Sequence, residues 1–321
     1  MGNFISFMKE VADGLQKSGN FGTAHIYRSS MNAVIAFNGS GNLSFRKVTQ
    51  AFLKKYESYL REKNCSWNTV STYLRTLRAV YNRAVDRHLA PYVPHHFRYV
   101  YTGTRADRKR ALEKEDMGLL MTKIPVGNYS ENSDLQRTRA LFFLMFLLRG
   151  MPFVDLAYLK KHDIDGNVLT YRRRKTGRLL TVTLTSEAMK LIERYMNTDS
   201  SSPYLFSLIT SAEGTEAAYK EYQLALRNFN YQLTILKEVL GLNTDISSYT
   251  ARHTWATMAY YCEVHPGVIS EAMGHSSITV TETYLKPFKN KKIDEANVKV
   301  ISSLGNLYKT SKLLNNRSVT L

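Results

Sequence analysis

Three side chains able to take part in chemistry lie in one stretch of the chain, Ser248 to Leu285, which reads SYTARHTWATMAYYCEVHPGVISEAMGHSSITVTETYL. They are Arg252, His275 and Tyr284, and each falls where a helix is expected to begin, end or turn. The guanidinium fork of an arginine suits bidentate contact with a phosphate, and a tyrosine hydroxyl can act as a nucleophile that becomes covalently attached. The stretch therefore holds candidates for anion binding and for nucleophilic chemistry.

Two helices are expected to position Arg252 and His275. The first begins near Thr250 and places Arg252 in its first turn. The second starts at Pro266, because proline is favoured at the first helical position, and ends at Gly274. His275 follows immediately, so we expect it to be held in a turn and not buried in a core.

A third, short helix is expected to carry Tyr284 in its last turn. Ser276 or Ser277 can cap its start, and the helix ends before Pro287. The residues between are largely β-branched, which weakens a helix because their side chains lose rotational freedom in it. They are Ile278, Thr279, Val280, Thr281 and Thr283. The sequence therefore predicts a mobile carrier for Tyr284.

The composition predicts a folded protein with an anionic partner. The chain has 321 residues, enough for two domains, and its 44 Lys+Arg against 27 Asp+Glu give a net charge of +17. Nucleic acid is the first candidate partner and a membrane surface the second. The longest apolar run, Ala140 to Leu148, is far shorter than the roughly 20 residues of a membrane span, so no membrane association is expected.

The two cysteines and the absence of cofactor motifs limit the function further. Cys65 and Cys262 are far apart and have no metal-ligand spacing, which indicates a reducing compartment without structural zinc. No phosphate-binding glycine loop and no carboxylate cluster at metal spacing occurs, so we expect neither a nucleotide nor a metal cofactor. The N-terminus lacks the pattern of a secretion signal. These features predict a cytoplasmic protein.

Residues 1–90 predict a helical domain with one basic face. Its four helical patterns run over Phe4–Lys17, from near Thr23 to Asn38, over Gln50–Glu62, and from Ser66 to about Leu89. The fourth pattern places Arg75, Arg78, Arg83 and Arg87 largely outside its apolar stripe, with Ser71, Thr76 and Asn82 between them as hydrogen-bonding groups. A basic helix face is often only solvated, but the net charge favours contact with phosphates.

Residues 91–110 form the predicted domain boundary. Pro91 and Pro94 interrupt the helical pattern, and the basic residues that follow include Arg105, Arg108, Lys109 and Arg110. A linker of this charge suits the DNA phosphate backbone. His95 and His96 have no nearby carboxylate or thiol and are expected at the surface.

A second domain is predicted over residues 111–308, followed by a polar tail over residues 309–321. Its helical patterns flank two alternating segments, Val168 to Arg174 and Leu179 to Thr185, which predict a β-hairpin. Lys175 lies at the tip of that hairpin or just before it. The segment Ile293 to Leu304 has an amphipathic helical pattern.

The motifs R-H-T at Arg252, G-H-S-S at His275 and T-x-x-Y ending at Tyr284, nine residues after that histidine, together resemble the tyrosine recombinases, also called the phage integrase family. The resemblance covers essentially the whole chain. It implies a mainly α fold with a small antiparallel β-sheet, in which a helical SAM-like core-binding domain precedes an α+β catalytic domain. It also implies a site-specific recombinase that needs no cofactor. Such an enzyme acts on double-stranded DNA as a homotetramer and is a monomer or dimer when free.

The resemblance also implies a role for each motif residue. Tyr284 matches the nucleophile, which attacks a DNA phosphodiester and becomes joined to the 3′-phosphate. Arg252 matches the family's second arginine and His275 a histidine that hydrogen-bonds the phosphate. Lys175 matches the lysine that serves as general acid. The helix at Ile293 to Leu304 resembles the tail that family members dock onto a neighbouring subunit.

The sequence departs from the family pattern at two positions. Arg149 is the best match for the first arginine, but the spacing to Leu159 and Asp163 fits only if residues 149–152 form an altered turn with a three-residue insertion. Tyr249 stands three residues before Arg252, where the family usually has histidine or another acid/base residue. A phenol with a pKa near 10 can donate a hydrogen bond but is a poor base at neutral pH.

Other interpretations remain open on the sequence alone. Tyr284 alone is compatible with a core residue, His275 with a capping residue and Lys175 with a solvated turn. A type IB topoisomerase uses related residues but reseals the same strand, and a non-catalytic DNA-binding protein of the same fold forms no covalent adduct. The chain starts almost at the core-binding helices, so we expect a simple recombinase or invertase without an arm-binding domain.

Overall fold

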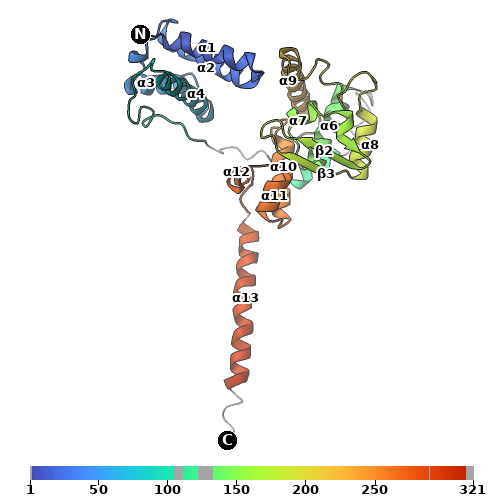
Figure 1. Cartoon of the computed structure of the whole chain (residues 1–321). Coiled ribbons are helices and arrows are strands. Elements are labelled where there is room, and N and C mark those ends of the chain that lie inside the picture. Colours follow the sequence, from blue (N-terminus) through green and yellow to red (C-terminus); the bar gives the residue numbers. More distant parts are fainter. Residues whose placement is uncertain (1, 105–110, 122–132, 289, 316–321) are drawn as a thin grey trace. The chain divides into compact units, whose positions relative to one another are not determined.

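The computed structural model describes residues 2–104, 111–121, 133–288 and 290–315 (Figure 1). As predicted, the fold is mainly α with a small antiparallel β-sheet. The first helices are α1 (Phe4–Lys17), α2 (Phe21–Asn38), α3 (Gln50–Glu62) and α4 (Trp67–Asp86). The later helices are α5 (Lys114–Met121), α6 (Asp134–Leu147), α7 (Phe153–Ala157), α8 (Ser186–Tyr195), α9 (Glu216–Val239), α10 (Thr250–Tyr261), α11 (Pro266–Ala272), α12 (Ile278–Glu282) and α13 (Asn290–Asn315).

The chain divides into two compact units. The first comprises Met1–Arg108, Phe153–Leu169 and Met189–Gln232, and the second comprises Lys109–Pro152, Thr170–Ala188 and Leu233–Leu321. All six residues predicted for the catalytic site fall in the second unit. Their geometry can therefore be described within that unit alone.

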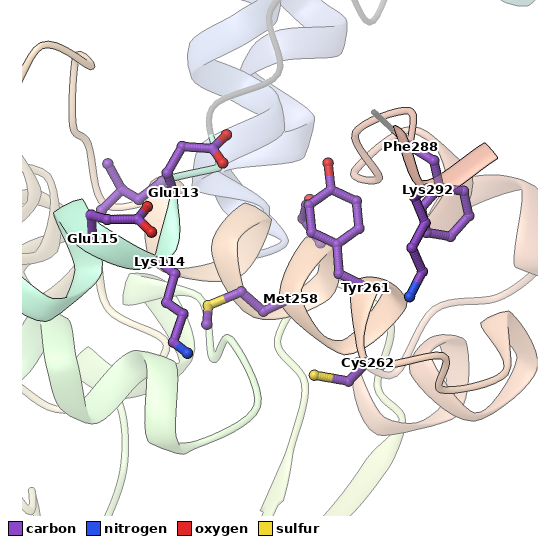
Figure 2. A pocket seen from close by; sticks show the side chains of 10 residues that line it. Glu113, Lys114, Glu115, Met258, Tyr261, Cys262, Phe288 and Lys292 are labelled. Carbon is purple, nitrogen blue, oxygen red and sulfur yellow. The ribbon is translucent and has the colours of Figure 1, made fainter. Parts of the chain in front are cut away.

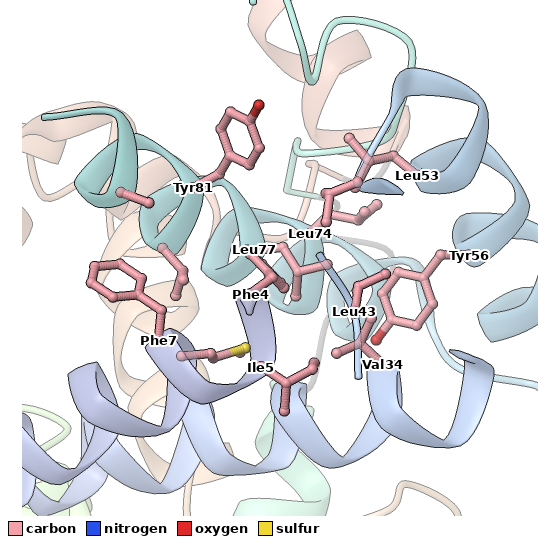
Figure 3. Close-up of a cluster of buried hydrophobic side chains, with 14 of the residues drawn as sticks. Phe4, Ile5, Phe7, Val34, Leu43, Leu53, Tyr56, Leu74, Leu77 and Tyr81 are labelled. Carbon is pink, nitrogen blue, oxygen red and sulfur yellow. The ribbon is translucent and has the colours of Figure 1, made fainter. Parts of the chain in front are cut away.

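Helices α1 to α4 enclose a hydrophobic core of their own (Figure 3). Phe4 and Met8 of α1, Leu53 of α3, and Leu74 and Leu77 of α4 are fully buried there. Side-chain caps fix where two of the helices begin, because Thr49 accepts a hydrogen bond from the Phe52 N–H and Ser66 accepts one from the Thr69 N–H. The helical periodicity and these caps explain why the predicted bounds of α1 and α3 match the structure.

Helix α4 presents its arginines to solvent. Arg75, Arg78, Arg83 and Arg87 are exposed, as the sequence predicted. The prediction for the polar residues between them was wrong in part, because Ser71 and Thr76 are buried. Thr76 donates its hydroxyl to the Thr72 carbonyl at 2.8 Å, so it bonds within the helix.

The segment after α4 returns to the same core. Ala90, Phe97 and Val100 belong to the buried cluster. His96 was predicted at the surface, but it is buried and lies against Tyr81 with ring centroids 4.4 Å apart. This burial lowers the pKa of His96. The ring contact with Tyr81 therefore places His96 in the aromatic part of this core and not at the surface.

Helix α6 contains the apolar run seen in the sequence and supports α10. Its start is capped by Ser133, and Leu141, Phe142 and Leu144 on it are buried. Helix α10 packs against it, which places the first turn of α10 beside the end of α6. Among the helices of the described ranges, none has the length and apolar character needed to cross a membrane.

The sheet has the strand order β1 (Ile164–Asp165), β2 (Val168–Arg172) and β3 (Leu179–Thr183). Strands β1 and β2 are antiparallel, with Ile164 opposite Leu169. Strands β2 and β3 were predicted with two more residues each, and β1 is too short for an alternation pattern to reveal it. The turn between β2 and β3 closes through a 2.8 Å bond from the Arg173 N–H to the Arg178 carbonyl.

Candidate active site

Arg252 is among the largest fully buried side chains of the described chain, with 2% of its surface exposed. Its Nη1 donates to the Gly150 carbonyl at 2.8 Å, and its Nη2 donates to the Met273 carbonyl at 2.7 Å. Nη2 also lies 2.8 Å from Nε2 of His275. Each of these three acceptors is a neutral group and none is a carboxylate, so the positive charge of Arg252 stays available to an anion.

The guanidinium of Arg252 also keeps an unused donor. Its Nε is buried and has no hydrogen-bond partner among the described residues. Burial, followed by repulsion from Arg173, lowers the pKa of Arg252, while Tyr284 opposes the change. A buried donor without a partner costs free energy, and a phosphate oxygen is the kind of acceptor that removes this cost.

The turn after α6 is shaped to meet Arg252. Arg149 and Gly150 both adopt left-handed backbone conformations, with φ angles of 58° and 69°. A Cβ atom on Gly150 would lie 2.8 Å from the Arg252 Cα, so only glycine fits. The turn thus contains two consecutive left-handed residues, and the three-residue insertion predicted at residues 149–152 stays a prediction. The side chain of Arg149 donates from Nη1 to the Thr181 carbonyl of β3 at 3.2 Å.

His275 occupies the turn after α11, but its side chain is buried. The prediction that it would not be buried was wrong, because Arg252 and Thr281 enclose the imidazole and 6% of the residue is exposed. An arginine only donates hydrogen bonds, so Nε2 of His275 must accept from Arg252. Nδ1 then carries the proton and donates to the Thr281 hydroxyl at 2.8 Å. His275 is therefore held as a neutral imidazole in one tautomer.

The pKa of His275 agrees with this hydrogen-bond pattern. Burial, and then the positive charges of Arg252, Arg173 and Lys175, lower it to about 3. The electrostatic effect of Lys175 also indicates that the hairpin tip lies within range of the imidazole. Lys175 itself is exposed, as a residue at the tip of a hairpin should be.

Tyr284 lies over the Arg252–His275 pair. Its ring stacks on His275 with centroids 5.0 Å apart and an interplanar angle of 24°, and the Arg252 Cζ lies 5.6 Å from the ring centroid. His253 lies against it at 4.6 Å. Tyr284 was predicted in the last turn of its helix, but α12 ends two residues earlier at Glu282. Three predicted residues, distant in sequence, thus form one cluster.

The chain beyond Tyr284 is tied to α10 and to the start of α5. The Tyr284 carbonyl accepts from the Thr257 hydroxyl at 3.2 Å, and the Tyr261 hydroxyl donates to the Pro287 carbonyl at 3.1 Å. Lys286 forms an ion pair with Glu113 at 3.0 Å. Beside these contacts lies a mostly apolar pocket of about 390 Å³, lined on opposite sides by α5 and by the segment from Phe288 (Figure 2).

Tyr249 lies at the edge of this cluster. It is the N-cap residue of α10, is 43% exposed, and approaches His253 with ring centroids 6.4 Å apart. His253 contacts both the Tyr249 ring and the Tyr284 ring. Its position leaves it accessible to a ligand but not packed on the Arg252–His275 pair.

Two arginines near the site were missed by the sequence reasoning. Arg173 is 5% exposed and donates to the Met273 carbonyl at 2.6 Å, while Arg178 donates to the His275 carbonyl at 3.0 Å. The available signal was the alternation of β2, which buries Leu169 and Tyr171 and brings Arg173 to the next inward position. Because Arg173 belongs to the basic run RRRK, we expected its side chain to be exposed.

The predicted DNA-binding residues are only partly described. Arg75, Arg78 and Arg83 are exposed on α4. Arg105, Arg108, Lys109 and Arg110 lie outside the described residues. Within the described part of the chain, no group of three or more His, Cys, Asp or Glu side chains is arranged to hold a metal ion.

Comparison with known proteins identifies the family. Residues 3–99 match the phage integrase SAM-like domain, and residues 110–291, more than half of the chain, match the phage integrase family. The chain belongs to the phage integrase family. It is therefore a DNA strand-transferring enzyme of the tyrosine recombinase type.

Curated relatives in the phage integrase family match over most of their length. The tyrosine recombinase XerC of Halalkalibacterium halodurans is 25% identical over 255 residues, which cover 77% of this chain and 80% of that protein. The XerC of Roseiflexus sp. is 22% identical over 287 residues, covering 87% of each chain.

Solved structures of family members share the fold. The Tn1549 transposon integrase in complex with transposon right end DNA matches with a TM-score of 0.65 and 14% identity, over 94% of this chain and 100% of that one. A lambda integrase dimer bound to a COC′ core site matches with a TM-score of 0.62 and 14% identity, over 87% of this chain and 94% of that one. At this identity the likeness concerns the fold.

Replacing Gly150 by alanine tests the fit of the turn against Arg252. Gly177 has the same φ angle of 69° but nothing within 4 Å of its missing Cβ, so Gly177→Ala is the matched control. The left-handed conformation destabilises both alanine variants by about 1 kcal/mol. Gly150→Ala adds a backbone clash and should lose at least about 1–2 kcal/mol more, seen as a lower thermal midpoint. Equal midpoints would contradict the described packing.

The low pKa of His275 predicts a pH dependence of stability. The unfolded chain protonates this residue below about pH 6.5, whereas the folded chain resists protonation down to about pH 3. Stability should therefore fall as the pH falls through this window, by up to about 1.4 kcal/mol per pH unit from this group. His275→Gln should flatten the decline in thermal midpoint between pH 7.5 and pH 5. The exposed His25→Gln should not, and equal slopes for all three proteins would refute the assignment.

Proposed function

We propose that this chain cleaves and rejoins DNA at specific sites through a 3′-phosphotyrosyl intermediate on Tyr284. The observation that carries the proposal is the stacking of the Tyr284 ring on His275, 5.0 Å away, beside a buried Arg252 that bonds to two backbone carbonyls and to a neutral imidazole. A phosphodiester needs such a cation and such a nucleophile at the same place.

The proposed reaction conserves the energy of the broken bond. The phenolic oxygen of Tyr284 forms a bond to phosphorus and its proton leaves to solvent. The bond from phosphorus to the 5′-oxygen breaks, and the electron pair goes to that oxygen, which takes a proton from the ammonium of Lys175. The released 5′-hydroxyl of a partner strand then reverses these steps on the phosphotyrosine. No nucleotide hydrolysis is required because one phosphoester replaces another.

Arg252, Arg149 and His275 bind the phosphate in this proposal. Arg252 brings the unpartnered Nε donor, and Arg149 exchanges its bond to the Thr181 carbonyl for one to a phosphate oxygen. His275 would donate to the phosphate from Nε2 once Arg252 no longer occupies that atom and the ring proton has moved from Nδ1, where it is bonded to Thr281, to Nε2. Tyr249 contributes at most a hydrogen bond, since it sits at the exposed edge.

The same residues suggest that the unliganded site is closed by its own nucleophile. Arg252 has 2% of its surface exposed, and the Tyr284 ring lies over it. A phosphate can reach Arg252 only after that ring moves. The β-branched α12 has no side-chain cap at Ser277, so displacing it costs little helix stability.

We further propose the arrangement of domains on DNA. Residues 1–90 would form the core-binding domain, 91–110 a basic linker with Arg105, Arg108, Lys109 and Arg110 along the backbone, 111–308 the catalytic domain and 309–321 a polar tail. The net charge of +17 and the exposed arginines of α4 support contact with phosphates. The matching Tn1549 and lambda integrase structures are complexes with DNA. A DNA substrate of this kind would place the protein in the cytoplasm, at the nucleoid.

Assembly into a homotetramer on paired sites is also proposed. Helix α13 exposes the apolar side chains Ile293, Val298, Val300 and Ile301, each more than half accessible. Such a stripe suits docking on a neighbouring subunit. A lambda integrase tetramer bound to a Holliday junction shares this fold, with a TM-score of 0.62 and 14% identity over 89% of this chain and 78% of that one.

The covalent intermediate can be trapped on nicked suicide DNA that carries the native site. We expect a protein–DNA band on denaturing electrophoresis for wild type and for Tyr231→Phe, which changes an exposed tyrosine of α9. Tyr284→Phe keeps the ring that stacks on His275 but lacks the nucleophile, so it should give no band. A band from Tyr284→Phe, or none from wild type on the correct site, would contradict the proposal. Relaxation of supercoiled DNA without strand exchange would indicate a topoisomerase instead.

The basic face of α4 can be tested through the salt dependence of binding. Each phosphate contact contributes about 0.9 to the slope of log affinity against log salt concentration. Arg75→Ala and Arg78→Ala should each reduce the slope by about 1, while Arg194→Ala on α8 makes the same change in net charge and should leave the slope unchanged. Equal slopes in all variants would exclude α4 as a phosphate-binding face.

A further inference from the structure

The hairpin that carries Lys175 is bonded at two points to the turn that carries His275. Arg173, at the end of β2, donates from Nη1 to the Met273 carbonyl at 2.6 Å. Arg178, at the start of the return strand, donates from Nη1 to the His275 carbonyl at 3.0 Å. The two accepting carbonyls flank Gly274, so both sides of the turn are held.

The contact between hairpin and turn is close as well as polar. Gly274 has a φ angle of 65°, and a Cβ atom there would lie 2.9 Å from the Arg173 Cδ and 3.0 Å from the Leu180 Cδ1. A side chain at Gly274 would therefore push the hairpin away. Because Gly274 has no side chain, the backbone of the turn can lie directly against the side chains of Arg173 and Leu180.

Arg173 is a buried cation that shares a hydrogen-bond acceptor with Arg252. It is 5% exposed, and it shares the Met273 carbonyl with Arg252, whose Nη2 bonds the same oxygen at 2.7 Å. Two positive charges at one acceptor repel each other, and the presence of Arg173 lowers the pKa of both Arg252 and His275. Burying a cation beside another one costs stability unless hydrogen bonds offset it, and the bond to the Met273 carbonyl is one such bond.

The hairpin tip itself is stiffened by a third arginine. Arg172 donates from Nη1 to the Gly177 carbonyl at 3.3 Å, and the Gly177 N–H donates to the Arg173 carbonyl at 2.7 Å. Lys175 lies inside this short turn, two residues after Arg173 and three before Arg178. Any displacement of the two bonded arginines would therefore displace the lysine.

We propose that Arg173 and Arg178 are positioning residues that hold the Lys175 hairpin on the His275 turn, so that the lysine ammonium meets the leaving oxygen of the phosphate bound at Arg252. The inference rests on the proposed function, in which Lys175 is the general acid. Neither arginine touches the substrate. Their effect passes through the placement of Lys175, and a proton donor misplaced by about 1 Å can lose up to roughly 100-fold in rate.

The protonation of the leaving oxygen by Lys175 can be tested separately from phosphate binding and folding. Such a test shows whether Arg173 and Arg178 act through the placement of Lys175. When the bond from phosphorus to the 5′-oxygen breaks, the electron pair on oxygen must receive a proton from Lys175. If that bridging oxygen is replaced by sulfur, the leaving group is a thiolate, which is a much weaker base than an alkoxide, leaves without a proton from the enzyme and takes one from solvent afterwards. A defect confined to the acid should therefore disappear on the sulfur substrate.

The experiment measures the rate of covalent adduct formation by the full chain on two otherwise identical DNAs, one with bridging oxygen and one with bridging sulfur at the cleavage position. On the oxygen substrate Arg178→Ala and Arg173→Gln should be slower than wild type by roughly 10- to 100-fold. On the sulfur substrate both should approach the wild-type rate. Arg178→Lys keeps a single donor for the His275 carbonyl and should retain most of the oxygen rate.

The outcomes distinguish this inference from the proposed function. Lys175→Ala is the reference, and it should be slow on oxygen and fast on sulfur. If Lys175→Ala behaves so but the arginine variants are equally slow on both DNAs, they act on phosphate binding or folding and the positioning role is wrong. If Lys175→Ala is not rescued by sulfur, the general-acid assignment fails and the positioning role fails with it.

Discussion

A buried guanidinium is tolerated in a protein only when most of its donors meet acceptors, and several segments of the second unit of this chain meet at one such group. Arg252 obtains its acceptors from the Gly150 carbonyl, the Met273 carbonyl and the imidazole of His275. These are dipoles and not carboxylates. They remove much of the cost of burial without neutralising the charge, which is the condition that a phosphate-binding site requires.

Satisfying Arg252 with backbone carbonyls also joins separate segments of the chain. The turn after α6, the end of α11 and the first turn of α10 all meet at this side chain, and each contributes a residue with a proposed role. The hairpin of β2 and β3 approaches the same carbonyl through Arg173. Tyr284 is the exception, because it sits beyond the weak helix α12 and contacts the pair through its ring face. Under the proposed roles, the phosphate-binding residues are held by several hydrogen bonds, whereas the proposed nucleophile follows an intrinsically weak helix.

Much of this arrangement could be predicted from the sequence, and the remainder depends on tertiary contacts. Caps and apolar spacing predicted the bounds of α1 and α3, whereas α2 begins at Phe21 instead of near Thr23 and α4 ends at Asp86 instead of about Leu89. The ordered motifs around Arg252, His275 and Tyr284 indicated the three residues that cluster in the structure. The burial of His275 was not predictable, since Thr281 and Arg252 reach it only in the folded chain. Arg173 lies in the basic run RRRK, and its charge led us to expect an exposed side chain. The alternation of the strand instead places Arg173 on the buried face.

The protonation state of His275 tests most directly whether Arg252 organises the site. Nitrogen NMR of protein carrying labelled histidine, with the His275 resonances assigned by their loss in His275→Gln, reports which ring nitrogen holds the proton. If Arg252 donates to Nε2, the ring is neutral and protonated at Nδ1 at pH 7, with Nε2 unprotonated, and does not titrate until well below pH 5. A ring protonated at Nε2, or one that titrates near pH 6.5, would show that Arg252 does not donate to His275 and would contradict the account.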